Sequence, residues 1–377
     1  MPTATLHVPR TPAASAAATP VDHALPILDL SNFTSGNPEQ RTAFVSRLRD
    51  IAYHVGFFYL RGYGASQTQI DAVLQVSRDF FALSPEQKQA IHMANSPHFR
   101  GYTAAGDEFT RGERDWREQL DIGAERAPIA QGPSSPAWTR MQGPNQWPSS
   151  LPHIKPALLD WQDTLTEAAR QLLRALALAL GQTEDRFDSA FAGTPVQHLK
   201  IIHYAGRASG ESRQGVGPHK DSGCLTLLLQ DTQAGLQVWE REGSGIAPGA
   251  GRWIDAPPIP GTLIINLGEV LEVLSNGYLR ANIHQVVSPP QSQDRLSVAF
   301  FLSPRLDAEL SELMLPAEQA AQARGIDRDP QNPLIAHTGR NLLKGRLRSH
   351  PEVAQRFYAD VLATEGIKPG AAPSAYA

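Results

Sequence analysis

Apolar residues recur at two different spacings along this chain, and the spacing changes near its middle. In the first half they often recur three or four positions apart, which is typical of amphipathic helices. We predict helices over 38–54, 66–81 and about 155–180. Two short apolar runs, 25–30 and 56–60, indicate strands that precede and separate these helices.

Capping sequences support the ends of the predicted helices. Segments 66–69 and 84–87 each place Ser three residues before Gln, which is the pattern of a capping box. Gly181 follows the long apolar stripe of the 155–180 segment and suits the C′ position. Residues 95–154 are rich in Pro, Gly and charged residues, so we predict mainly loops there.

The second half of the chain has a residue pattern typical of β-strands. Between 196 and 304, short β-rich runs alternate with Gly and Pro turns, a pattern typical of an all-β sandwich or barrel. The runs are 198–204, 224–230, 235–239, 262–266, 282–287 and 295–302. We therefore predict a mixed α and β fold with flanking helices around a double-stranded β-helix, or jelly-roll, core.

These patterns divide the chain into five regions. We expect a disordered N-terminal segment, an N-terminal region, a scaffold helix, the jelly-roll core, and a C-terminal helical region with a tail that is loose after about residue 367. The regions span 1–24, 25–150, 151–195, 196–305 and 306–377.

Composition excludes several function classes. A net charge of −4 gives no basic surface for nucleic acid or an anionic membrane. No stretch of about 18 apolar residues exists, so we predict no transmembrane helix. The first residues lack the basic and apolar segments of a signal peptide. The single cysteine, Cys224, cannot form an intrachain disulfide and reads as a core thiol, which fits a reducing cytosol. We expect a cytoplasmic protein that acts on a small molecule.

Two His-x-Asp/Glu pairs are candidates for metal binding. With 12 His and 38 acidic residues among 377, chance alone supplies about one such pair. His350-Pro351-Glu352 precedes an apolar helical pattern, so we interpret it as a helix start. His219 and Asp221 lead into the 224–230 strand, and residues i and i+2 of an extended chain point to one face. We predict that these two side chains converge.

A third ligand and an anion site follow on later strands. His284 lies in the 282–287 run, and Arg295 with Ser297 begins the next run after a Pro-Pro turn. We expect these two runs to be adjacent antiparallel strands. Two imidazoles and one carboxylate form the ligand set of non-haem Fe(II) sites. A buried Arg295 requires an anionic partner, which a dicarboxylate co-substrate supplies. A zinc hydrolase would use the same ligands but would leave Arg295 without a role.

These motifs identify a family resemblance over about residues 25–305. The chain resembles the isopenicillin N synthase-like group of Fe(II)/2-oxoglutarate dioxygenases, whose His-x-Asp…His triad matches His219, Asp221 and His284. The family's Arg-x-Ser motif matches Arg295-Leu296-Ser297, and Tyr204 stands where family members place a tyrosine that binds the co-substrate. Further similar segments are 26–30, 56–58, 235–238, 260–269 and 274–277, with Glu269 where Asp is more common.

The resemblance implies a specific activity. Fe(II) would be bound by the triad, 2-oxoglutarate by Arg295, Ser297 and Tyr204, and O₂ at a remaining position. Oxidation of the 2-oxoglutarate to succinate and CO₂ would accompany hydroxylation or desaturation of a small-molecule metabolite. In the segment that resembles the family's substrate-facing region, Arg100 and Tyr102 are candidates for binding a carboxylate or stacking on a ring.

Two other functions share parts of this pattern. An isopenicillin N synthase-type oxidase uses iron and oxygen without 2-oxoglutarate, and it has the same arginine, serine and tyrosine positions. A non-enzymatic jelly-roll binding protein would bind no Fe(II). Succinate formation coupled to oxygen use separates the predicted dioxygenase from both alternatives.

Overall fold

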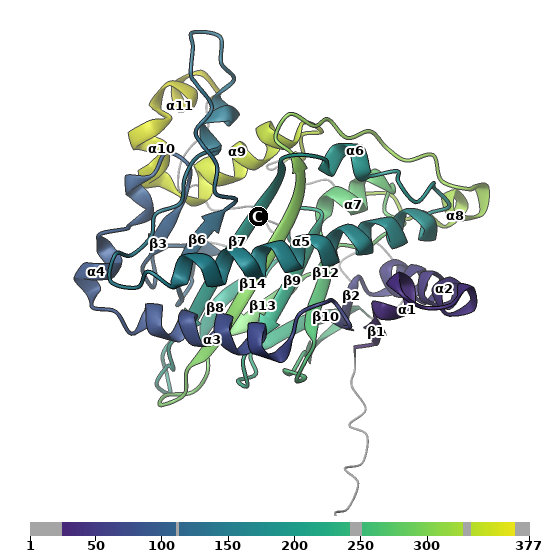
Figure 1. The fold of residues 1–377 in the computed structure, drawn as a ribbon, viewed down its shortest axis with the longest axis horizontal. Helices are drawn as coiled ribbons and strands as arrows, with labels where there is room; N and C mark the ends of the chain where they lie inside the picture. Colours follow the sequence, from purple (N-terminus) through teal and green to yellow (C-terminus); the bar gives the residue numbers. More distant parts are fainter. Residues whose placement is uncertain (1–24, 111–112, 242–250, 327–332, 366–377) are drawn as a thin grey trace, which may run out of the picture.

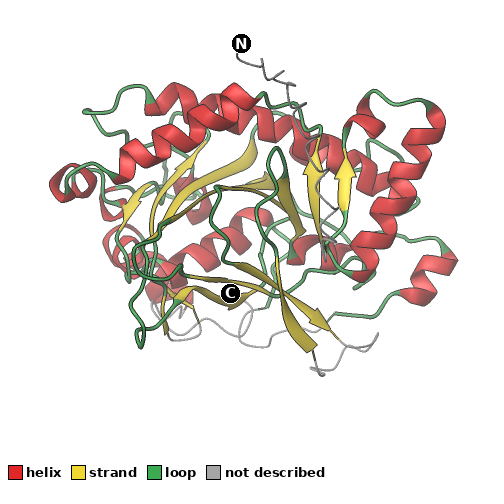
Figure 2. Ribbon diagram, turned by 90° about the horizontal axis from the view of Figure 1, so that it is seen from below, coloured by secondary structure: helices red, strands yellow, loops and turns green. Residues whose placement is uncertain are grey.

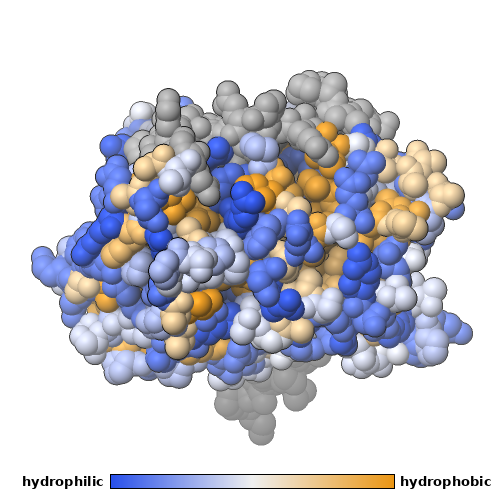
Figure 3. All heavy atoms as spheres, turned by 90° about the horizontal axis from the view of Figure 1, so that it is seen from above, coloured by the Kyte–Doolittle hydropathy of each residue, from blue (hydrophilic) through white to orange (hydrophobic). Residues whose placement is uncertain are grey.

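Two β-sheets that face each other form the centre of the molecule, and helices cover the outer face of the larger sheet (Figures 1 and 2). The computed structural model describes residues 25–110, 113–241, 251–326 and 333–365. The predicted disordered segment 1–24 and the tail after 367 lie outside these ranges. On the face seen in Figure 3, hydrophilic and hydrophobic residues are interspersed.

The larger sheet contains most of the predicted strands. In order across the sheet its strands are β1 (Ile27–Asp29), β2 (Phe57–Arg61), β12 (Leu263–Leu267), β9 (Leu225–Gln230), β14 (Arg295–Arg305), β7 (Pro195–Tyr204), β6 (Glu118–Gly123) and β3 (Gly101–Thr103). Neighbours pair antiparallel apart from β1 and β2. Strands of the N-terminal region thus form both edges of the sheet, and β9 and β14 lie at its centre.

The smaller sheet faces the larger one and has the order β11 (Gly251–Asp255), β10 (Leu236–Arg241), β13 (His284–Val287) and β8 (Gln214–His219). The expectation that the runs of His284 and Arg295 are paired neighbours is wrong, because β13 pairs with β10 and β8 while β14 pairs with β7 and β9. The Pro-Pro turn therefore carries the chain from one sheet to the other. The two faces still meet in the interior, as a jelly roll requires.

The helices predicted over 38–54, 66–81 and about 155–180 are all present, together with two shorter ones in the same half of the chain. They are α1 (Ser31–Thr34), α2 (Pro38–His54), α3 (Gln67–Phe81), α4 (Pro85–Gln89) and α5 (Ile154–Ala179). Both predicted capping boxes are present, at Ser66 and at Ser84. Gly181 adopts φ +67° just after α5, where a left-handed residue ends a helix without Cβ strain.

The helices of the remaining regions are short. They are α6 (Asp188–Phe191), α7 (Glu269–Leu274), α8 (Ala317–Gln322), α9 (Thr338–Ser349), α10 (Pro351–Phe357) and α11 (Ala359–Glu365), with 3₁₀ turns at Met93–Asn95 and Ala137–Met141. Helix α10 begins at Pro351, which confirms the helix-start interpretation of His350-Pro351-Glu352. Within the described ranges no helix combines the length and hydropathy that a membrane crossing needs.

Three apolar clusters hold these layers together. The largest packs α2, α3 and α5 against one face of the large sheet, with Leu158, Trp161 and Leu172 of α5 fully buried. A second fills the space between the two sheets. A third joins α9, α10 and α11 to residues of the N-terminal region such as Phe99. The C-terminal helices are thereby fixed beside one end of the sandwich (Figure 1).

The region predicted to be mainly loop contains strands. Residues 95–154 include β3, β6 and the small hairpin of β4 (Phe109–Thr110) and β5 (Glu113–Arg114). Strand β6 pairs along β7 from Glu118↔His203 to Gly123↔His198 and so extends the large sheet. The Pro and Gly residues around β6 hid a regular alternation, in which Leu120 and Ile122 face the helices. This alternation turns Gln119 and Asp121 to the interior.

Candidate active site

His219 and Asp221 lie at the open end of the smaller sheet. His219 is the last residue of β8, and Asp221 follows in the turn that leads to β9. The two side chains converge as predicted, with His219 Nε2 3.6 Å from Asp221 Oδ1. The sequence pattern predicted this pair at the start of the strand that follows. In the structure His219 instead ends β8, and Asp221 lies in the turn between β8 and β9.

His284 completes the group from the neighbouring strand. It begins β13 directly opposite His219, and the centroids of the two imidazole rings are 4.3 Å apart. His284 Nε2 lies 3.8 Å from Asp221 Oδ1. One ligand atom from each of the three residues lies within 4.8 Å of the others, which is close enough to bind a single metal ion. The donor set of two imidazoles and one carboxylate fits Fe(II).

Backbone hydrogen bonds orient both imidazoles toward this point. His219 Nδ1 donates to the carbonyl of Gly217 at 2.8 Å, and His284 Nδ1 donates to that of Asn282 at 3.3 Å. With the proton on Nδ1, each Nε2 keeps a lone pair for a metal. Burial and the adjacent His219 lower the pKa of His284 to about 4, so its imidazole is neutral at physiological pH.

The second carboxylate oxygen of Asp221 is held by neighbouring strands. Thr226 Oγ1 and Asn266 Nδ2 both donate to Oδ2, the latter at 2.7 Å. Burial alone would raise the pKa of Asp221, but the two imidazoles and the hydrogen bond from Thr226 hold it well below its usual range. Asp221 is therefore ionised with Oδ1 directed at the histidines, and sequence reasoning gave no role to Thr226 or Asn266.

Arg295 is a buried cation beside this centre. It begins β14, is 0% exposed, and lies opposite Tyr204 of β7, whose ring centroid is 4.9 Å from its guanidinium carbon. It donates to Ser297 Oγ at 3.4 Å and to Gln230 Oε1 at 2.9 Å, while its Nε has no partner. No carboxylate of the described residues forms an ion pair with it. The structure thus brings Arg295, Ser297 and Tyr204 together, in a place that suits an anion.

A cavity of about 600 Å³ opens beside the metal ligands. His219 and Asp221 line one side of it, and Arg100, Lys200 and Arg346 line another. These last residues come from the segment before β3, from β7 and from α9, so three distant parts of the chain enclose one volume. This volume suits a small organic substrate.

Several polar residues around the cavity were not predicted. Asp121 of β6 accepts from His198 at 2.6 Å, and Lys200 Nζ lies 3.3 Å from the same carboxylate. Glu108 accepts from Arg117 at 2.6 Å. The available signal was period-two alternation of charged and apolar residues in 118–123 and 195–204, which places polar side chains on one sheet face.

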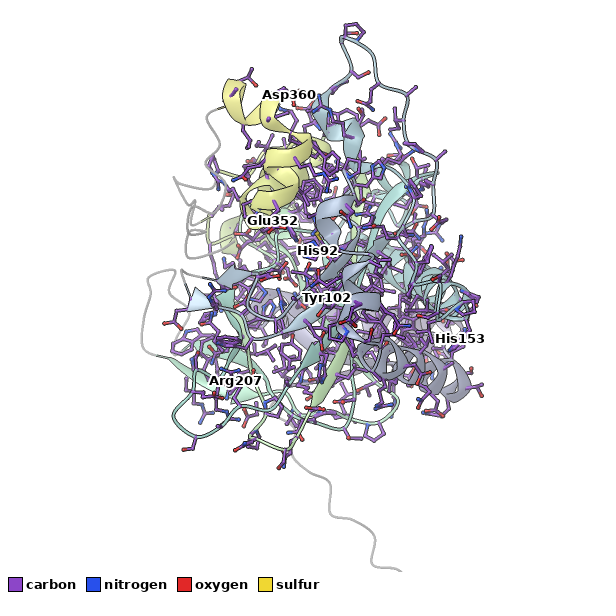
Figure 4. The ribbon with its side chains drawn as sticks, turned by 90° about the vertical axis from the view of Figure 1, so that its left-hand side faces the viewer. His92, Tyr102, His153, Arg207, Glu352 and Asp360 are labelled. Carbon is purple, nitrogen blue, oxygen red and sulfur yellow. The ribbon has the colours of Figure 1, made fainter. Side chains whose placement is uncertain are left out.

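The two residues predicted to contact the substrate lie in different places. Arg100 lines the cavity. Tyr102, which Figure 4 labels, is buried on the opposite face of the sheet, and its hydroxyl donates to Glu118 at 2.7 Å. A contact between Tyr102 and a substrate in this cavity is therefore wrong, because strand β3 turns residue 102 toward the helices. His203 also faces that side, and Cys224 is a buried core thiol, as predicted for the cysteine.

Comparisons with known proteins agree with this site. Residues 25–150 match the family model of the non-haem dioxygenase in morphine synthesis N-terminal region, and residues 195–304 match that of the 2OG-Fe(II) oxygenase superfamily. The chain therefore belongs to the 2OG-Fe(II) oxygenase superfamily. The first match covers the predicted N-terminal region, and the second covers nearly all of the predicted jelly-roll core, including every residue predicted to bind iron or 2-oxoglutarate.

Relatives and solved structures extend the match to most of the chain. A 2-oxoglutarate-dependent dioxygenase, frbJ, from Dothideomycetidae sp. (strain 11243) is 35% identical over 90% of this chain and 94% of its own length. A homoarginine-6-hydroxylase from Glycine max is 33% identical over 77% of this chain and 88% of its own. A 2OG-Fe(II) oxygenase family protein from Caulobacter crescentus has a TM-score of 0.68 at 28% identity, over 86% of this chain and 99% of its own. Full-length Neurospora crassa T7H in complex with alpha-KG gives 0.67 at 26% identity, over 88% and 99%.

The class of the protein follows from these findings together. It is a non-haem iron oxidoreductase that uses Fe(II), 2-oxoglutarate and O₂. The predicted family, jelly-roll fold and enzyme class are confirmed. Relatives named as 2-oxoglutarate-dependent dioxygenases favour this activity over the oxidase and the non-enzymatic binding protein.

Proposed function

We propose that this chain hydroxylates a small charged molecule bound in the 600 Å³ cavity, with one iron held by His219, Asp221 and His284. The observation that carries the proposal is the convergence of those three ligands beside a buried arginine that lacks an ion pair. In the overall reaction the substrate gains a hydroxyl group while 2-oxoglutarate and O₂ give succinate and CO₂. The bound iron supplies the oxygen chemistry.

The protein's own residues bind, orient and shield. Arg295 and Ser297 bind the distal carboxylate of 2-oxoglutarate, with Tyr204 packed beside them. Thr226 and Asn266 hold one oxygen of Asp221, so that the other is aimed at the metal. Burial of these groups keeps water from the reacting centre.

The charged lining of the cavity supports a charged substrate. Arg100, Lys200 and Glu108 all line it, and an apolar substrate would leave Arg100, whose buried Nε has no partner, without one. Relatives at 32–33% identity from Glycine max and Arabidopsis thaliana are named homoarginine-6-hydroxylases. Homoarginine is therefore the first substrate to test, and succinate release that depends on it is the expected result.

Anaerobic titration with Fe(II) and 2-oxoglutarate tests the two sites directly. We expect the wild-type protein to show the metal-to-ligand charge-transfer band of bound 2-oxoglutarate. His219→Ala should lose the band through loss of iron. Arg295→Ala should keep iron binding and require much more 2-oxoglutarate. Arg305→Ala is the matched control, because Arg305 lies at the far end of the same strand and pairs with Asp307. A titration of Arg295→Ala that equals wild type would remove Arg295 from the site.

A further inference from the structure

The cavity beside the iron ligands has a charged wall that iron chemistry does not need. The side chains that line it or lie directly behind it include four cations and three carboxylates. They are Arg100, Arg117, Lys200 and Arg346, with Glu108, Asp115 and Asp121.

Most of these charges are satisfied within the protein. Arg117 donates to Glu108 at 2.6 Å, and Lys200 Nζ lies between two carboxylates, 3.3 Å from Asp121 and 3.8 Å from Glu108. Asp115 accepts from Thr110 at 2.7 Å and lies 3.9 Å from Arg117. Each of these charged groups therefore has a charged partner within the protein.

Arg100 stands outside this network. Its NH1 donates to the carbonyls of His98 and Phe99, at 2.9 and 3.3 Å, and its buried Nε has no partner. Among the residues that the structure describes, none forms an ion pair with it. Burial and the nearby Arg346 lower the pKa of Arg100 to about 10, so it stays protonated at neutral pH. A cation without a counter-charge in this position is costly unless an anion joins it.

The backbone around Arg100 is built to hold it there. Phe99 has φ +55°, a left-handed conformation that is rare for a bulky residue. Its buried ring stacks on Tyr358 of the C-terminal region, at 5.4 Å between centroids, which holds the strained backbone in place. On the other side, Gly123 of β6 has no side chain, and a Cβ there would collide with the Arg100 guanidinium.

Arg346 reaches the same place from helix α9. Its NH1 lies 3.5 Å from Asp121, and its NH2 lies 2.9 Å from the ring nitrogens of His198. Burial and Arg346 hold the pKa of His198 well below its usual range, so this imidazole is neutral and adds no charge. Arg100 and Arg346 thus place two guanidinium groups near one carboxylate, Asp121.

We propose that the organic substrate carries a carboxylate that binds between Arg100 and Arg346. This inference rests on the proposed function and names the substrate's chemical class. Guanidinium groups bind carboxylates bidentately, and a substrate carboxylate would be the ion-pair partner that Arg100 lacks. Because Arg346 belongs to α9, the C-terminal helices take part in substrate recognition.

The test compares hexanoate with hexanamide, which differ in charge at one end. Each is titrated by calorimetry into protein saturated with Fe(II) and 2-oxoglutarate under anaerobic conditions. We expect hexanoate to bind at least about tenfold more tightly than hexanamide. Arg100→Gln and Arg346→Gln should each remove this preference, and Arg100→Lys should restore part of it. Arg126→Gln is the matched control, because Arg126 lines the same cavity but is held by Pro195 and Gln197.

Three results would overturn the inference: equal binding of acid and amide, a preference that survives both glutamine variants, or hexanoate that competes with 2-oxoglutarate and so binds at Arg295. The charge-transfer band is recorded on the same samples. If the band is present without a hexanoate preference, this inference alone fails. If the preference is present without the band, the proposed function alone fails. Melting temperatures of the variants show whether each is folded. If Arg100→Gln does not fold, Arg346→Gln and Arg100→Lys together still test the inference.

Discussion

Strands β6 and β7 carry two clusters of similar side chains on opposite faces of one sheet. On the inner face, Asp121 meets His198 and Lys200. On the outer face, Glu118 meets His203 and Lys88. Each cluster joins a carboxylate, an imidazole and an ammonium group. Residue types alone therefore do not distinguish them.

The clusters differ in how completely their polar atoms are paired. Glu118 accepts from Lys88 at 2.8 Å, Tyr102 at 2.7 Å and His203 at 2.9 Å, and no atom of these residues is left without a partner. The inner wall leaves Arg100 Nε, Arg117 Nε and Gln119 Oε1 buried and unpaired, and it lines the cavity beside the iron ligands. Complete pairing indicates a role in stability, and incomplete pairing at a cavity indicates a binding surface.

The largest expected effect contrasts one carboxylate from each face. Asp221→Ala removes a metal ligand, so we expect loss of Fe(II) binding and a fall of at least ~1000-fold in 2-oxoglutarate turnover. Glu118→Ala should keep both Fe(II) binding and 2-oxoglutarate turnover at wild-type levels. Iron content after anaerobic loading and succinate release measure the contrast, and circular dichroism checks that each variant is folded. Normal iron content in Asp221→Ala would remove it from the metal site.

The second prediction reverses the roles of the two faces. Glu118→Ala leaves Lys88 and His203 without their carboxylate in a largely buried site, so the free energy of unfolding should fall by about 3 kcal/mol. Urea denaturation measures the change. The Michaelis constants for 2-oxoglutarate and substrate should stay at wild-type values. A variant with unchanged stability and impaired substrate use would contradict the assignment of the outer cluster.

The outer cluster also predicts a pH dependence of stability. Burial alone would raise the pKa of Glu118, but hydrogen bonds from His203, Lys88 and Tyr102 lower it to about 2. A lowered carboxyl pKa stabilises the fold above the unfolded value of about 4.5 and loses this effect as pH falls toward 2. The shift corresponds to at most about 3 kcal/mol. Urea midpoints of wild type and Glu118→Gln should therefore converge over this range, and a constant difference between them would contradict the assignment.

The sequence revealed regular periodicity well and sheet pairing poorly. Helices α2, α3 and α5 were predictable because caps and apolar stripes are local signals. Strand β6 was not, because it lies among Pro and Gly residues and is only six residues long. The switch of the chain between sheets after β13 depends on tertiary contacts, so no local pattern reports it.

The residues proposed to bind iron and the anion could be named from the sequence because they occur in a recognisable order along the core strands. The cavity wall was not, since Glu108, Asp121 and Arg346 come from three regions with no shared motif. Tyr102 shows that closeness in sequence to a cavity residue does not place a side chain in the cavity. It lies two residues from Arg100, yet the strand turns it to the opposite face.

A smaller effect is expected from the support of the metal ligand. Asn266→Ala removes the hydrogen bond to Asp221 Oδ2 while all three ligands remain. Loss of such an orienting contact typically weakens metal affinity by about 10–100-fold. Fe(II) competition with a chelator measures the affinity. Asn145→Ala is a matched control, because that buried asparagine bonds to Gly123 and Glu125 away from the metal ligands. An unchanged affinity in Asn266→Ala would show that Thr226 alone orients Asp221.

The smallest predicted effect tests where Tyr102 acts. Tyr102→Phe keeps the buried ring and removes only the hydrogen bond to Glu118, so the free energy of unfolding should fall by about 1 kcal/mol. The Michaelis constant for the substrate should not change, because the hydroxyl lies on the face opposite the cavity. In Glu118→Gln the same substitution should cost less, since the charged acceptor is already absent. A raised Michaelis constant with unchanged stability would instead place Tyr102 at the substrate and would make the two faces of the sheet functionally alike.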